Sequence, residues 1–160
     1  MTHFKRSINK NILDRSVEEN RGWVINEMNK IEAKIDNVII QYFKPADSLK
    51  FQKIMLNSSI IPIGGKVKIL GNIEKFDKKI LEKIREISSI RNAFAHIPIL
   101  MHFKFEENAN SNGDFKAVSI TDKIEVMNSA GILKLKTVKE ELEKFSSLNN
   151  EIVDYFTSYK

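Results

Sequence analysis

The chain has 160 residues, of which 42% are hydrophobic and 29% charged, so one globular domain with a buried core is expected. A net charge of +5 and a pI of about 9.3 favour a polyanionic partner only weakly, because most charges are Lys and Glu mixed along helix faces. The absence of cysteine excludes disulfides, cysteine catalysis and cysteine-ligated metal, and it fits a cytoplasmic protein.

The first 15 residues are basic and polar, and they lack the apolar core of a secretory signal. We therefore expect residues 1–15 to form a flexible N-terminal segment of a single domain that spans residues 1–160. No run of about 18 apolar residues occurs in the sequence, so no membrane span is expected.

A long helix is expected to begin after Ser16, because Ser16 and Glu19 have the spacing of a capping box. Apolar residues then recur at helical spacing up to Tyr42, and the pair Lys44-Pro45 should end the helix. Glu27 is a charged residue on this apolar stripe, and a buried charge is tolerated only when it is paired.

The next segment is predicted to contain two shorter helices. Asp47 and Ser48 are suited to cap a helix that runs to about Leu56. Gly64-Gly65 precedes Lys66 and invites comparison with a phosphate-binding loop, but the spacing of that motif and its Lys-Ser/Thr pair are absent. The two glycines are therefore interpreted as a tight turn before a short helix.

A second long helix has the clearest apolar stripe in the chain and ends in the sequence Arg91-Asn92-Ala93-Phe94-Ala95-His96. At about 100° per residue, the stripe consists of Ile73, Phe76, Ile80, Ile84, Ile87, Ile90 and Phe94. Arg91 lies within it, whereas the opposite side carries a polar stripe formed by Lys78, Arg85, Ser89, Asn92 and His96.

Arg91 and His96 are suited to phosphodiester chemistry without a metal. A guanidinium binds phosphate through a planar fork of donors, and an imidazole exchanges a proton near neutral pH. The two residues are about 140° apart around an ideal helix. To act together they need a curled Arg91 side chain, a distorted last turn before Pro98, or a second copy of the helix. Glu27 is the expected structural partner of Arg91, and this pairing is compatible with a catalytic role.

The sequence RNAFAH resembles the Arg-polar-x-x-x-His signature of the HEPN superfamily, whose small helical domains include metal-independent ribonucleases and non-catalytic relatives. The preceding stretch from residue 60 resembles the mannitol-operon-repressor-like branch of that superfamily, with a glycine-containing loop, a short helix and a long helix that ends in the motif. The resemblance covers residues 23–97 and not the last third of the chain. It implies an antiparallel helical bundle that dimerises with the two motifs facing a shared cleft.

After the motif the apolar period changes from helical to alternating. The alternation from Ile99 to Phe105 predicts a strand, Asn112-Gly113 predicts a hairpin turn, and a second strand is expected from Phe115 to Ile120. A further short extended piece is expected near residues 123–127, which makes residues 99–127 a β-hairpin insertion. Thr137 then starts a final amphipathic helix that runs almost to the C-terminus.

The expected fold is thus mainly α, an antiparallel helical bundle of HEPN type with an inserted β-hairpin before the C-terminal helix. The expected function is a metal-independent endoribonuclease that requires no cofactor, with Arg91 as phosphate ligand, His96 as general acid/base and Asn92 as an orienting residue. Further RNA contacts are assigned to Lys78, Arg85 and Ser89.

The expected partners are RNA and a second copy of the chain, and the resemblance leaves a protein inhibitor or partner open, together with a toxin, defence or regulatory role. The alternative function is a non-catalytic regulatory or partner-binding module. In that case Arg91 pairs with Glu27 or with the second copy, and His96 caps carbonyl groups at the helix end.

Overall fold

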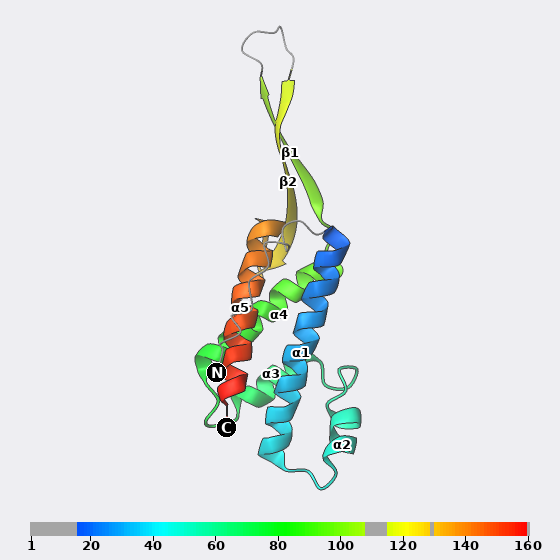
Figure 1. Cartoon of the computed structure of the whole chain (residues 1–160), viewed down its shortest axis with the longest axis vertical. Coiled ribbons are helices and arrows are strands. Elements are labelled where there is room, and N and C mark those ends of the chain that lie inside the picture. The colour runs from blue at the N-terminus through cyan, green and yellow to red at the C-terminus, as the bar shows by residue number, and fades with distance from the viewer. Residues whose placement is uncertain (1–15, 108–114, 129, 160) are drawn as a thin grey trace, which may run out of the picture.

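A computed structural model describes residues 16–107, 115–128 and 130–159 (Figure 1). In this part of the chain the protein is mainly helical, with a small three-stranded antiparallel sheet, and the sheet precedes the last helix as predicted. The elements are α1 (Val17–Phe43), α2 (Ser48–Lys50), η2 (Phe51–Met55), α3 (Ile63–Gly71), α4 (Lys78–His96), β1 (Leu100–Glu107), β2 (Phe115–Met127), β3 (Leu133–Thr137) and α5 (Val138–Ser158). The expected flexible segment 1–15 and the expected Asn112-Gly113 turn lie outside the described residues.

Helix α1 has the predicted start and end. The Ser16 Oγ accepts the Glu19 amide at 3.2 Å, and the Glu19 carboxylate accepts the Ser16 amide at 2.7 Å, which completes the capping box. Helix α1 ends at Phe43, and Lys44 adopts the left-handed region with a φ of 46° before Pro45. The left-handed conformation of Lys44 therefore ends the helix, together with Pro45, which cannot continue it.

The predicted tight turn at Gly64-Gly65 is wrong, because both glycines lie in the first turn of α3. A Cβ atom on Gly65 would lie 3.0 Å from Cγ2 of Ile61, closer than side chains normally pack. Gly65 therefore permits a close approach between α3 and the preceding loop.

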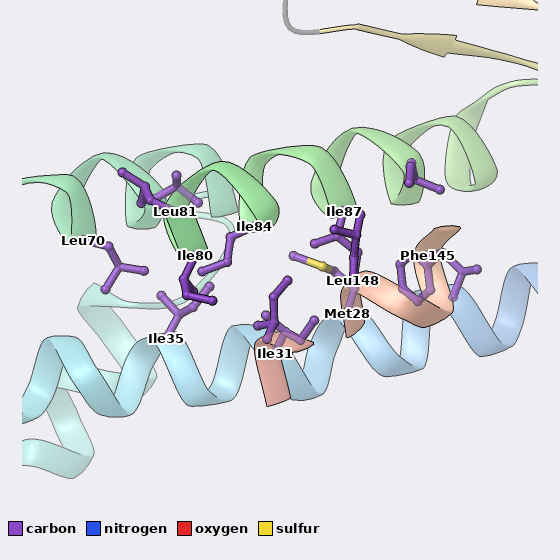
Figure 2. Close-up of a cluster of buried hydrophobic side chains, with 14 of the residues drawn as sticks. Met28, Ile31, Ile35, Leu70, Ile80, Leu81, Ile84, Ile87, Phe145 and Leu148 are labelled. Carbon is purple, nitrogen blue, oxygen red and sulfur yellow. The ribbon is translucent and has the colours of Figure 1, made fainter. Parts of the chain in front are cut away.

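Helices α1, α4 and α5 enclose the main core (Figures 1 and 2). The predicted apolar stripe of α4 faces this core, and its residues Ile84, Ile87 and Phe94 are completely buried. Helix α5 contributes Phe145, whose ring meets Trp23 of α1 edge to face at 5.3 Å. Burial of one face of α4 leaves its opposite face for polar residues. None of the described helices is long and apolar enough to cross a membrane.

The sheet is larger than predicted and projects from the helices (Figure 1). The separate extended piece expected near residues 123–127 is the second half of β2, which pairs with β1 through its first half and with β3 through its second. Strand β3 was not predicted. Ile124 and Val126 of β2 are buried, whereas β3 is exposed along most of its length. Few residues of β3 therefore face the core.

Replacing Ile84 by Ala is expected to lower the free energy of unfolding by about 2–5 kcal/mol, because its fully buried side chain would leave a cavity between α4 and α1. Ile25→Ala is the matched control, since Ile25 is 39% exposed, and it should change stability by less than about 0.5 kcal/mol. Urea unfolding followed by circular dichroism measures both values. Equal losses in the two variants would contradict this description of the core.

Candidate functional site

The candidate site lies at the C-terminal end of α4. Asp77 caps the other end of this helix, where its Oδ1 accepts the Lys79 amide at 2.7 Å. The buried stripe holds α4 in a fixed rotation, with Arg91 half-buried at the edge of the core. Arg91 Nη1 donates to Oδ1 of Asn92 at 3.0 Å, so the fold brings these two predicted site residues together.

His96 is the last residue of α4 and its side chain is exposed. In the described part of the chain, no hydrogen bond or ion pair engages the imidazole or joins it to Arg91. The helix continues regularly to its end, where the Ile97 amide donates to the carbonyl of Ala93 at 2.9 Å. Of the three alternatives for bringing Arg91 and His96 together, a distorted last turn before Pro98 is therefore not observed.

Sequence reasoning missed Arg21, which α1 brings to the same end of α4. Its Nη2 donates to the carbonyl of Ile97 at 2.7 Å, one residue beyond His96. The contact joins residues 76 positions apart, and the only sequence signal was an arginine in the first turns of a long helix. Arg21 therefore ties the start of α1 to the end of α4 and places a second guanidinium near His96.

The expected pair between Glu27 and Arg91 is not formed among the described residues. Glu27 is buried on α1, but its Oε1 pairs with Lys30 Nζ at 2.6 Å and its Oε2 accepts from Asn149 Nδ2 at 3.5 Å. Lys30 lies one turn further along α1, and Asn149 comes from α5. A local lysine and a buried amide thus compensate the carboxylate that we had expected Arg91 to neutralise.

The three further residues predicted to contact RNA have different surroundings. The Ser89 hydroxyl donates to the main-chain carbonyl of Met127, at the end of β2, and thereby fastens the sheet to α4. Arg85 is exposed and forms an ion pair with Glu82. Lys78 is exposed in the first turn of α4, roughly 27 Å from His96 at 1.5 Å per residue. The polar stripe is therefore spread along the helix rather than gathered at one point.

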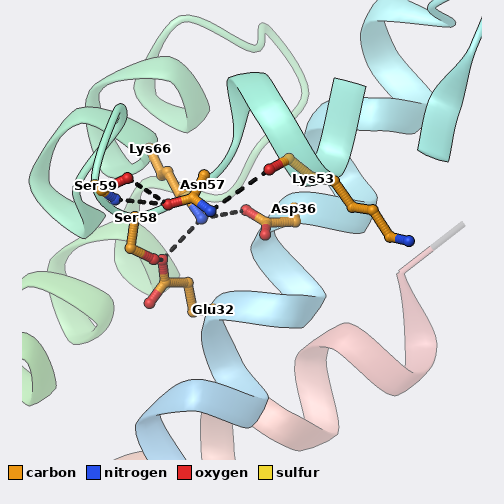
Figure 3. Close-up of polar contacts among 7 residues, drawn as sticks. All are labelled: Glu32, Asp36, Lys53, Asn57, Ser58, Ser59 and Lys66. Carbon is orange, nitrogen blue, oxygen red and sulfur yellow. Dashed lines mark hydrogen bonds and ion pairs between the residues drawn. The ribbon is translucent and has the colours of Figure 1, made fainter. Parts of the chain in front are cut away.

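A second polar cluster lies inside the molecule between α1 and α3 (Figure 3). Lys66 of α3 is completely buried, and its Nζ lies 2.7 Å from Oε1 of Glu32 and 2.8 Å from Oδ1 of Asp36. The Ser58 hydroxyl also donates to Glu32 Oε1, at 2.6 Å. Lys66 is thus engaged by two carboxylates of α1 and points into the protein, which is incompatible with a phosphate-loop role.

The two carboxylates of this cluster differ in proton affinity. Burial raises the pKa of Glu32, but the hydrogen bonds from Lys66 and Ser58 and the positive charges of Lys66 and Arg91 outweigh it, so its pKa is lowered. Burial also raises the pKa of Asp36, and the negative charge of Glu32 adds to the rise, so that Lys66 compensates only in part. Relative to the unfolded chain, the fold therefore lowers the proton affinity of Glu32 and raises that of Asp36.

Comparison of the chain with protein-family models, curated proteins and solved structures found no match. Within the described ranges, no group of three or more His, Asp or Glu side chains is arranged to hold a metal ion.

Lys66→Met is expected to lower the free energy of unfolding by about 3–5 kcal/mol, because it leaves two buried carboxylates without their cation. Lys68→Met is the matched control, since Lys68 is exposed on the same helix. Thermal and urea unfolding at neutral pH measure the difference. A Lys66→Met variant as stable as the control would show that the cluster contributes nothing to folding.

At neutral pH, Glu32→Gln is expected to destabilise the protein more than Asp36→Asn. The lowered pKa of Glu32 means that its carboxylate contributes stability above its ordinary pKa of 4.5, and this contribution is lost as the pH falls through the folded-state value. The raised pKa of Asp36 has the opposite sign, so its contribution is present at low pH and is lost as the pH rises through the folded-state value. Urea titrations across the acidic range should show the two variants converging, and a larger loss in Asp36→Asn at neutral pH would contradict the assignment.

Proposed function

We propose that this protein is a metal-independent endoribonuclease, built as an antiparallel helical domain of HEPN type. The observation that carries the proposal is the end of α4, where an exposed His96 follows one turn after the hydrogen-bonded pair Arg91 and Asn92. A proton-transfer group and a phosphate-binding cation are the two groups that RNA cleavage through its own 2′-hydroxyl requires.

In the proposed reaction His96 removes the proton from a ribose 2′-hydroxyl, and the 2′-oxygen attacks the adjacent phosphorus. The bond from phosphorus to the 5′-oxygen of the next nucleotide breaks, and that oxygen takes up a proton from the protonated imidazole of His96 or from water. The products are a 2′,3′-cyclic phosphate and a free 5′-hydroxyl. Arg91 neutralises the charge that develops on the phosphate oxygens, and Asn92 holds the guanidinium through their hydrogen bond.

Within the described residues the His96 imidazole makes no hydrogen bond to a carbonyl group, which favours a chemical role for His96 over the capping role of the alternative function. The carbonyl of Ile97 is already satisfied by a guanidinium at 2.7 Å. His96 is exposed, so its imidazole is accessible to a substrate. Arg21 also becomes a further candidate for phosphate binding, because its charge lies at the same helix end.

The proposed enzyme is a homodimer in which each catalytic unit uses groups from two chains. Arg91 and His96 lie on different sides of a regular helix and share no hydrogen bond within the described part of one chain. If the α4 helices of two chains meet at this end, Arg91 of one chain can act together with His96 of the other. Of the expected RNA contacts, Lys78 and Arg85 remain on the exposed face, whereas the Ser89 hydroxyl is already engaged with β2.

His96→Ala is expected to reduce the rate of RNA cleavage in EDTA by about 10²–10⁴, because it removes the proton-transfer group. Arg91→Ala should reduce it as well, through loss of phosphate binding. His102→Ala is the matched control, since this exposed histidine lies on β1, and it should leave the rate unchanged. Cleavage is measured on a labelled single-stranded RNA, with the 2′,3′-cyclic end identified by mass spectrometry.

Three outcomes of this assay would refute the mechanism: loss of activity on chelation, full activity in His96→Ala, or an equal loss in His102→Ala. A mixture of the inactive His96→Ala and Arg91→Ala chains should recover part of the activity if two copies share one site. A wild type inert on every RNA tested would favour the alternative, a regulatory or partner-binding module, for which the exposed apolar residues of the sheet provide a separate surface.

A further inference from the structure

The face of the sheet that points away from the helices carries several exposed apolar side chains. Ile124 and Val126 of β2 are buried against the helical part, so the alternate residues of this strand point outward. Antiparallel partners lie on the same face, which places Leu133 beside Met127 and Leu135 beside Glu125. Four large apolar side chains of this outer face are half exposed: Leu100 (56%), Met127 (50%), Leu133 (48%) and Leu135 (50%).

Two opposite charges lie in the middle of this outer face. Lys123 is flanked by Leu100 on β1 and by Thr137 on β3, and Glu125 lies next along the same side of β2. At about 3.4 Å per residue the two positions are about 7 Å apart. Within the described residues neither side chain has an ion-pair partner.

We propose that this outer face binds the same face of a second copy of the chain, with Lys123 of each copy paired to Glu125 of the other. The two-fold axis would lie between the two sheets, perpendicular to the direction of β2 and level with Ile124. It places position 123 of each copy opposite position 125 of the other. Each Lys123 then faces a Glu125 across two sheets that pack about 10 Å apart. The patch is therefore complementary to itself, as an interface between identical chains must be.

Charged residues of the sheet disfavour two other ways of covering this surface. Pairing along the edge of β3 is opposed by Lys134 and Lys136, because lysines on an edge strand disfavour the addition of another strand. Burial in a membrane is opposed by the two charges at the centre of the patch. Face-to-face packing of two copies removes apolar surface from water and compensates both charges.

This association goes beyond the proposed ribonuclease activity and does not depend on it, because it uses the sheet rather than the end of α4. Light scattering and sedimentation on the full chain without RNA should detect a dimer at micromolar concentration. Glu125→Lys and Lys123→Glu should each raise the dimer dissociation constant by about tenfold or more, because each variant sets like charges against one another twice.

Two recovery experiments separate an interface from a general effect on folding. The double variant Lys123→Glu/Glu125→Lys restores opposite charges across the interface and should dimerise again. An equal mixture of the two single variants should form a heterodimer through the sheet, although neither variant associates with itself through this face. Contacts within one chain cannot produce that result.

Leu135→Asp tests the apolar part of the patch, and Leu49→Asp is its control, because Leu49 is 60% exposed on α2. Leu135→Asp should lose the association through the sheet and Leu49→Asp should keep it, with melting temperatures that show both to be folded. A monomeric wild type, single charge variants that associate as tightly as the wild type, or a mixture that associates no better than its components would each overturn the proposal. A monomeric wild type would also contradict the proposed two-chain catalytic unit, whereas the other two outcomes leave the RNA-cleavage assay unaffected.

Discussion

The burial of one face of α4 against α1 and α5 determines the positions of most other features. Ile84, Ile87 and Phe94 are completely buried, so the helix cannot rotate without exposing its core residues. This rotation leaves Arg91 at the edge of the core and turns His96 to the surface at the helix end. The same constraint directs Ser89 to the carbonyl of Met127, and that hydrogen bond helps the buried Ile124 and Val126 to attach the sheet to the helical part.

Polar groups in and near the core are satisfied over long sequence distances. Lys66 of α3 joins two carboxylates of α1, and Arg21 of α1 binds the carbonyl that follows α4. A buried charge without a partner costs several kcal/mol, so such contacts specify which helices pack together and in which register. The contact of Arg21 also positions the candidate site, because it holds the segment that leads from His96 into β1.

The sheet divides its residues between two roles. On one face Ile124 and Val126 join the core, whereas on the other Leu100, Leu135 and their neighbours remain half exposed around Lys123 and Glu125. The helices therefore use only one side of the sheet. Catalysis at the end of α4 and association through the outer face of the sheet would accordingly use different surfaces of the same small protein.

The sequence by itself determined the features that depend on local periodicity and local chemistry. The start of α1 at Ser16, its end before Pro45, the core stripe of α4 and the pairing of β1 with β2 all follow from residues close together in the chain. Tertiary structure decided the partners. Lys66 entered a buried cluster with two carboxylates of α1, Glu27 bonded to Asn149 rather than Arg91, and β3 formed by pairing with an existing strand. These contacts join residues far apart in sequence, and only the packing of complete helices and strands brings such residues together.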